Sequence, residues 1–273
     1  MRKRNLILFT GTLIIFVFIA TLSLAQDKII LKNGEVMTGK IVKSDNKGIT
    51  VEIMEGKATL TIPPEKILEV KIQKPGLFKT AQEYYIRGEY DLAFEAYKII
   101  AQRYGGYSWG QEAFLIAAQC LMKMNNYSEL TKWYQNFLDD FPQSKIAPQV
   151  ELNLADIYLT EEDYLRAMQT YERLVKDRKG EPVAKGYYGM GDCYFQQKKF
   201  EEALVCYLKI AVLYYEFRDE VANALLKSAE CYQALNDNKR MMETYREVIK
   251  EFPGTEYAKR ANEALMSLKE AER

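Results

Sequence analysis

The chain has 273 residues, with 38 Lys plus Arg against 38 Asp plus Glu and no histidine. The balanced charge argues against a nucleic-acid partner bound through bulk charge. The lack of histidine removes Ser-His and Cys-His nucleophiles and the commonest metal ligand. Since no phosphate-binding glycine loop stands out either, we expect a non-enzyme with no catalytic residues, no cofactor and no metal.

Residues 1–25 have the pattern of a secretory signal peptide. A basic start is followed by residues 6–25 without any charge, and Ser23 and Ala25 place small side chains just before a cleavage point at Gln26. An uncleaved membrane anchor over residues 6–25 is the alternative, because this stretch is long enough to span a bilayer. Both interpretations predict a periplasmic or other extracytoplasmic location, with membrane contact only if the segment is retained.

Residues 26–73 contain short alternating apolar runs separated by turn-forming residues, which predicts a small all-β barrel domain. Residues 31–34 (LKNG) and 39–41 (GKI) resemble the first half of an Sm-like barrel. Residues 62–67 (IPPEKI) replace the Arg-Gly pair of the second Sm motif, so the RNA binding of that family is not expected. An SH3-like adaptor barrel, or a cap on the helices that follow, is the alternative.

Residues 77–271 repeat one helical pattern five times. A small residue recurs every 36 to 38 residues, followed on a second helix by a tyrosine. The small residues are Ala81, Ala118, Ala155, Gly191 and Ala229, and the tyrosines are Tyr97, Tyr134, Tyr171, Tyr207 and Tyr245. Because residues at i, i+3, i+4 and i+7 share a helix face, each unit is predicted to be a helical hairpin with the small residue at the crossing.

The pattern is clearest at residues 187–207 (YYGMGDCYFQQKKFEEALVCY), and it resembles the tetratricopeptide repeat, or TPR. The resemblance implies a mainly α fold, in which a TPR superhelix of about five hairpins ends in a capping helix at residues 255–270 and follows the small barrel. The Phe-Pro-x-Ser/Thr-x-x-Ala turns at residues 141–147 and 252–258 look like those of exported TPR proteins that accompany the Tol-Pal system or outer-membrane assembly.

The resemblance also implies a binding groove on the first helices, at the residues one and four positions after each small residue. The predicted groove residues are Tyr85, Gln119, Met122, Asp156, Leu159, Asp192 and Phe195. An extended peptide or a partner helix would place apolar side chains on the apolar members, and backbone or basic groups on the amides and carboxylates. The alternative, strongest for Leu159, is that these residues pack against the neighbouring repeat.

The cysteines favour packing over chemistry. Cys120, Cys193 and Cys231 each stand two positions after a small residue, and no Cys-x-x-Cys pair occurs. We therefore expect buried free thiols, although export permits disulfides and Cys193 with Cys206 is the pair within one hairpin.

Two functions remain open at this point. The first is a non-enzymatic exported scaffold or adaptor that binds a protein or peptide partner, possible partners including an envelope complex, in cell-envelope assembly or maintenance. The second is a carbohydrate- or peptidoglycan-associated envelope protein with carboxylates as acid and base, for which no carboxylate pair stands in an evident cleft.

Overall fold

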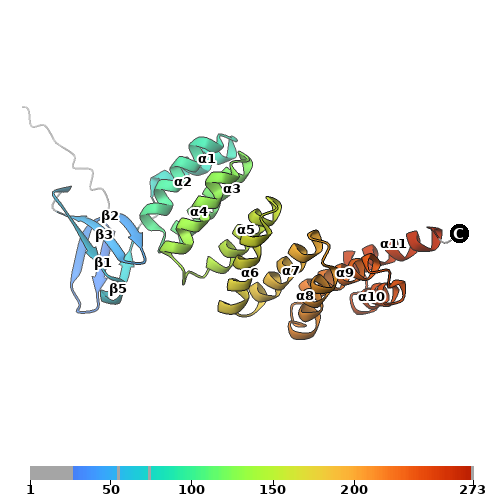
Figure 1. The fold of residues 1–273 in the computed structure, drawn as a ribbon. Coiled ribbons are helices and arrows are strands. Elements are labelled where there is room, and N and C mark those ends of the chain that lie inside the picture. Colours follow the sequence, from blue (N-terminus) through green and yellow to red (C-terminus); the bar gives the residue numbers. More distant parts are fainter. Residues whose placement is uncertain (1–26, 54–55, 73–74, 272–273) are drawn as a thin grey trace, which may run out of the picture.

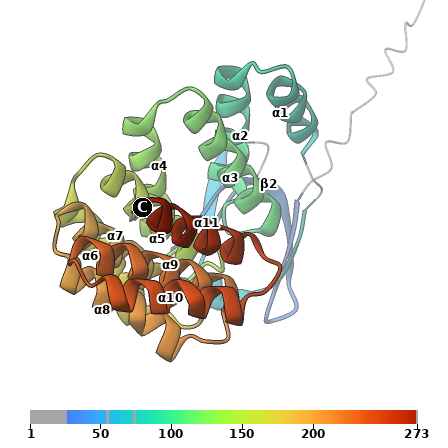
Figure 2. The ribbon, with the colours of Figure 1, turned by 90° about the vertical axis from the view of Figure 1, so that its right-hand side faces the viewer.

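A computed structural model describes residues 27–53, 56–72 and 75–271, so the predicted signal segment lies outside the described residues. Figure 1 shows a β-sheet at one end, followed by an array of helices that leads away from it to the C-terminus. Seen from the far end in Figure 2, α10 and α11 lie in front and the sheet lies behind.

The strands form one antiparallel sheet in the order β4-β3-β2-β1-β5. They are Asp27–Leu31 (β1), Val36–Asp45 (β2), Gly48–Ile53 (β3), Ala58–Ile62 (β4) and Ile67–Lys71 (β5), with a 3-10 turn at Pro64–Lys66. The long strand β2 pairs with β1 in its first half and with β3 in its second, and the register shifts between Ile41 and Lys43. At Gly39 a Cβ atom would lie only 2.5 Å from Val51 Cγ1, so this close approach requires glycine.

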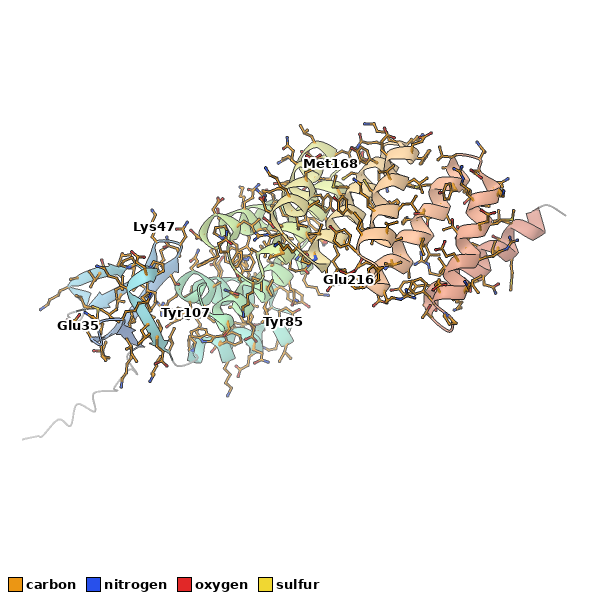
Figure 3. The ribbon with its side chains drawn as sticks, turned by 90° about the horizontal axis from the view of Figure 1, so that it is seen from below. Glu35, Lys47, Tyr85, Tyr107, Met168 and Glu216 are labelled. Atoms are coloured by element: carbon orange, nitrogen blue, oxygen red, sulfur yellow. The ribbon has the colours of Figure 1, made fainter. Side chains whose placement is uncertain are left out.

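The predicted closed barrel is wrong. Strands β4 and β5 are the two edges of an open sheet. Pro63 and Pro64 have no N–H to donate to a ladder, and the 3-10 turn carries the chain across to β1, with which β5 pairs. The apolar side of the sheet is instead continuous with the core of the first helices. Asn46 Nδ2 donates to Asp139 O at 3.1 Å, and Tyr107, labelled in Figure 3, lies at the same junction.

The helices form five hairpins and a final helix, as predicted. They are Gly76–Ile86 (α1), Tyr90–Tyr104 (α2), Ser108–Lys123 (α3), Tyr127–Asp140 (α4), Ala147–Thr160 (α5), Tyr164–Asp177 (α6), Glu181–Gln196 (α7), Phe200–Leu213 (α8), Arg218–Ala234 (α9), Asn238–Glu251 (α10) and Glu256–Ala271 (α11). The hairpins are α1/α2, α3/α4, α5/α6, α7/α8 and α9/α10, and α11 packs on α10 and α9.

Each hairpin turns through one residue with positive φ. Gly88 has φ 77°, and Asn125, Glu162, Lys198 and Asn236 have φ between 55° and 60°. This left-handed residue ends the first helix and lets the N–H group of the next residue return to a carbonyl of that helix: for example, Asp163 N donates to Tyr158 O at 2.8 Å. The second helix can then start antiparallel to the first.

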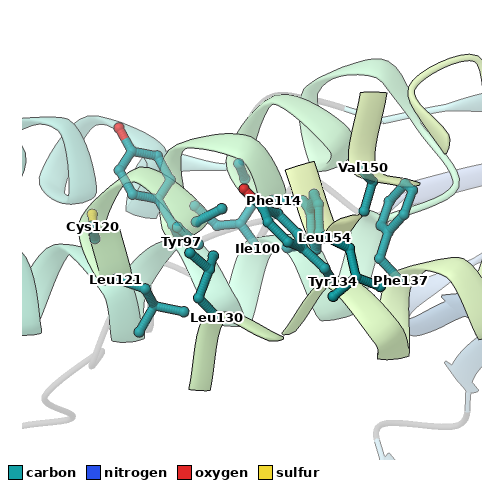
Figure 4. Packing of buried hydrophobic residues seen from close by; sticks show 14 of the residues in the cluster. Tyr97, Ile100, Phe114, Cys120, Leu121, Leu130, Tyr134, Phe137, Val150 and Leu154 are labelled. Atoms are coloured by element: carbon teal, nitrogen blue, oxygen red, sulfur yellow. The ribbon is translucent and has the colours of Figure 1, made fainter. Parts of the chain in front are cut away.

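The second-helix tyrosines are buried in register, as the repeat pattern predicts, with exposed fractions of 0% to 6%. They belong to two hydrophobic clusters, one that joins the sheet to the helices as far as α7 and one that continues to α11. Figure 4 shows Tyr97 and Tyr134 in the first cluster, beside Leu130 and Phe114. The core therefore runs the length of the array.

Candidate functional site

In two consecutive hairpins a buried tyrosine of the second helix donates its hydroxyl to a carboxylate of the first. Tyr171 Oη donates to Asp156 Oδ1, and Tyr207 Oη donates to Asp192 Oδ1 at 2.5 Å. Glycines of α7 make room for the rings: a Cβ atom at Gly189 would lie 2.2 Å from Tyr171 Cζ. The tyrosines thus fix the position of two carboxylates that border the surface hollows described next.

The two carboxylates are partly desolvated. Burial raises the pKa of both Asp156 and Asp192 above the ordinary value of 3.8, and the tyrosine hydroxyl, which stabilises the ionised form, opposes that rise. Asp156 nevertheless presents an exposed edge to solvent, and Asp192 is half-buried. Since Oδ1 of each accepts the tyrosine hydrogen bond, Oδ2 is the atom that can meet a ligand.

The first hollow, which we name the apolar hollow, lies between α3, α4 and α5 and has a volume of about 280 Å³. Its lining is Met122, Tyr127, Leu130, Tyr134, Asn153, Asp156, Ile157, Thr160 and Glu161. Met122 and Tyr127 are 47% and 44% exposed. An apolar side chain of a ligand would bury both.

The second hollow, which we name the polar hollow, lies across α5, α7 and the start of α9 and has a volume of about 500 Å³. Its lining is Gln149, Leu152, Asp156, Leu159, Thr160, Lys185, Tyr188, Gly189, Asp192 and Glu220. Asp156 and Thr160 line both hollows. The two hollows together, named the groove from here on, therefore meet at α5 and involve helices of four hairpins.

Three segments match family models described as tetratricopeptide repeat, at residues 152–176, 184–214 and 223–255. The chain carries tetratricopeptide repeats. The matched segments fall on the hairpins α5/α6, α7/α8 and α9/α10, and α1/α2 and α3/α4 continue the same TPR array towards the sheet.

Solved structures, two of them described as TPR proteins, share this fold. The chain is similar to the C-terminal part of a TPR repeat-containing protein from Cytophaga hutchinsonii, at TM-score 0.52 and 18% identity, over 72% of this chain and 76% of that one. It is also similar to BtubC (BKLC) from P. vanneervenii, at TM-score 0.53 and 14% identity, over 69% and 79% of the two chains. A tetratricopeptide repeat protein from Parabacteroides merdae aligns at TM-score 0.51 and 16% identity, over 65% and 66%. No curated protein matches the chain.

Four of the seven predicted groove residues line the hollows of the TPR array: Met122, Asp156, Leu159 and Asp192. The other three have neighbours elsewhere. Tyr85 Oη donates to Gln119 Oε1 at 3.3 Å, which joins α1 to α3. The half-buried ring of Phe195 packs against Phe200, with ring centroids 5.3 Å apart, and Lys227 Nζ lies 5.2 Å from its centre. A binding role for all seven residues stays a prediction.

Seven of the ten residues that line the polar hollow were not predicted from the sequence. Leu152 and Tyr188 stand four residues before Asp156 and Asp192, and Gln149 and Lys185 stand seven before them. These positions lie one and two helical turns towards the start of the same helix face. Extending the repeat pattern in that direction would have found them, whereas Glu220 of α9 has no such signal.

The cysteines take no part in the groove. All four are buried and free, as expected, and burial raises the pKa of Cys120 to about 11 and those of Cys193 and Cys231 to about 12. Thiols with such pKa values are protonated at neutral pH and poor nucleophiles. Within the described parts of the chain, no group of His, Cys, Asp and Glu side chains is arranged to hold a metal ion, and no helix is long and apolar enough to cross a membrane.

Proposed function

We propose that this protein is an exported, non-enzymatic scaffold that binds a protein or peptide partner in the groove of its TPR array, in cell-envelope assembly or maintenance. TPR folds generally serve as protein-interaction scaffolds, and the TPR structures similar to this chain share its fold. The envelope role is supported by the basic and then uncharged N-terminal sequence.

The observation that carries the binding proposal is the groove. It combines exposed apolar side chains with carboxylates whose positions are fixed by hydrogen bonds from buried tyrosines. It extends over α3, α5, α7 and α9. A surface of this length suits a polypeptide segment, because main chain and successive side chains can each find a contact.

Site-specific photo-cross-linking tests the groove as a protein-binding surface. A photoreactive amino acid replaces Gln149, which lines the polar hollow, or Glu172, which is exposed on the second helix of the same hairpin. In the cells that produce the protein, we expect a discrete cross-linked partner from position 149 and none from position 172. Equal products from both positions, or none from position 149, would contradict the proposal.

The export proposal has a separate test. Mass spectrometry of the protein isolated from its own cells should find a chain that starts at Gln26, in the extracytoplasmic fraction. A chain that keeps residues 1–25 and sits in the membrane would support the anchor instead. An intact chain in the cytoplasm would contradict both forms of export.

A further inference from the structure

The apolar hollow lies at the hairpin α3/α4, whose packing differs from that of its neighbours. The crossing position of the second helix is Ala93, Ala167 and Ala203 in three hairpins, but it is Leu130 in α4. Trp133 of α4 also stacks on Phe114 of α3, with ring centroids 5.2 Å apart. The helices α3 and α4 are in less extensive contact than the helices of the other hairpins, including α9/α10, where Met241 stands at the crossing position. The hollow opens beside this looser crossing.

The charged side chains that line the groove are mostly negative. Four carboxylates line the two hollows, at Asp156, Glu161, Asp192 and Glu220, against a single ammonium group at Lys185. That ammonium already has acidic partners: Lys185 Nζ lies 2.6 Å from Glu181 and 3.8 Å from Glu220. A cationic ligand would therefore find unbalanced negative charge, in a setting where burial makes ionised carboxylates costly.

We propose that the groove binds an extended peptide segment that places a bulky apolar side chain in the apolar hollow and a lysine or arginine side chain in the polar hollow. This inference rests on the proposed function and adds the chemistry of the partner. Because Asp156 and Thr160 line both hollows, the two side chains belong to one short segment. The cation meets Oδ2 of Asp156 or Asp192, and the ring of Tyr188 offers it a π face.

The test is a selection from a random linear peptide library displayed on phage, with the purified protein as the target. We expect the selected peptides to be enriched in lysine or arginine next to a large apolar residue. A synthetic copy of one such peptide is then titrated into the wild-type protein and four variants. Its affinity for the wild type should fall as the salt concentration rises.

The variants separate charge from apolar contact. Asp156→Asn and Asp192→Asn remove a charge but keep an oxygen that can accept the tyrosine hydroxyl, and each should weaken peptide binding about tenfold. Met122→Asp, at an exposed position, should also weaken it about tenfold by removing the apolar contact. Glu172→Gln removes an exposed carboxylate outside the groove and should change nothing. Thermal denaturation confirms that each variant is folded.

The outcomes distinguish this inference from the proposed function. Peptides that lose affinity for Met122→Asp, but lack basic residues and bind both asparagine variants as tightly as wild type, would overturn the inference and leave groove binding in place. Peptides unaffected by every groove variant would contradict both. A library without binders would contradict an extended occupant, while cross-linking from position 149 would still report on a folded partner.

Discussion

Two kinds of helix crossing occur in the array. The hairpins α5/α6 and α7/α8 show one kind, and the hairpin α3/α4 shows the other. In the first two, alanine stands at the crossing, and a fully buried tyrosine reaches a carboxylate on the first helix. In α3/α4 the crossing residue is Leu130, and Tyr134 Oη only accepts a 3.4 Å hydrogen bond from Asn153 Nδ2 of the next hairpin. In the same hairpin, Trp133 stacks on Phe114.

The difference shows how a repeat array acquires a binding site. Close crossings hold the carboxylates in place, and the looser crossing leaves a hollow beside them that its own side chains do not fill. The proposed binding surface therefore lies where two kinds of hairpin meet. Two properties of the close crossings can be tested. One is whether the helices resist moving apart, and the other is whether burial of the carboxylates lowers the free energy of unfolding.

The largest expected effect is the loss of a tyrosine from a close crossing. Tyr207→Ala should destabilise the fold by about 3–5 kcal/mol, because the ring is fully buried and its space cannot refill. Phe195→Ala, at a half-buried ring on the same hairpin, should cost less. Chemical denaturation of both variants measures the two free energies of unfolding. If Phe195→Ala cost as much as Tyr207→Ala, Phe195 would be core and its predicted place in the binding site would be wrong.

The sequence predicted most of the helical array, because its signals are local. Small residues and tyrosines at one period specify hairpins that contact only their neighbours. The left-handed residues in the turns were harder to predict from the sequence. Glycine at position 88 is typical of such a residue, but Glu162 and Lys198 adopt the same conformation and their residue types do not indicate it. Closure of the sheet would require β5 to pair with β4 as well as with β1, and the pairing of β5 with β1 joins residues far apart in the chain.

The site was predicted in part for the same reason. The period placed Asp156 and Asp192 on the correct helix face, but their hydrogen bonds to Tyr171 and Tyr207 depend on how closely the helices cross. The apolar hollow is lined in part by Leu130, which replaces the alanine of the neighbouring hairpins. A pattern that averages over repeats cannot show what one hairpin does differently.

The second prediction fills the space that a close crossing needs. Gly189→Ala would place a Cβ atom 2.2 Å from Tyr171 Cζ in a buried setting, so we expect a loss of about 3 kcal/mol from overpacking. Gly76→Ala is the matched control, because a Cβ atom there meets nothing within 4 Å. Chemical denaturation should show a large loss for the first variant and little change for the second. Similar values for both would mean that α7 can move away from Tyr171 at little cost.

The third prediction compares the tyrosine hydroxyls of the two kinds of hairpin. Tyr171→Phe removes the donor to Asp156 and should cost about 1–2 kcal/mol, since the carboxylate is charged but partly solvated. Tyr134→Phe removes only the acceptor of a long bond from a neutral amide and should cost about 0.5–1 kcal/mol. Equal losses in thermal or chemical denaturation would erase the distinction drawn between the two hairpins.

The fourth and smallest effect concerns the charge of Asp192. Burial raises the pKa of this carboxyl above 3.8, Glu230 and Asp156 add to the rise, and Tyr207 and Lys227 oppose it. A raised pKa means that the folded chain holds the proton more tightly than the unfolded chain. The contribution of Asp192 to the stability of the fold is therefore fully present below pH 3.8, and it is lost as the pH rises through the pKa of the folded state.

Asp192→Asn stays neutral at every pH, and its Oδ1 can still accept the Tyr207 hydroxyl. The variant should be slightly more stable than the wild type at pH 7, and the difference in Tm should shrink as the pH falls towards 4. Glu172→Gln, which removes an exposed carboxylate on α6, should show no such trend. If Asp192→Asn were instead less stable at neutral pH, its surroundings would favour the ionised carboxylate, and a cationic ligand would gain nothing by relieving its desolvation.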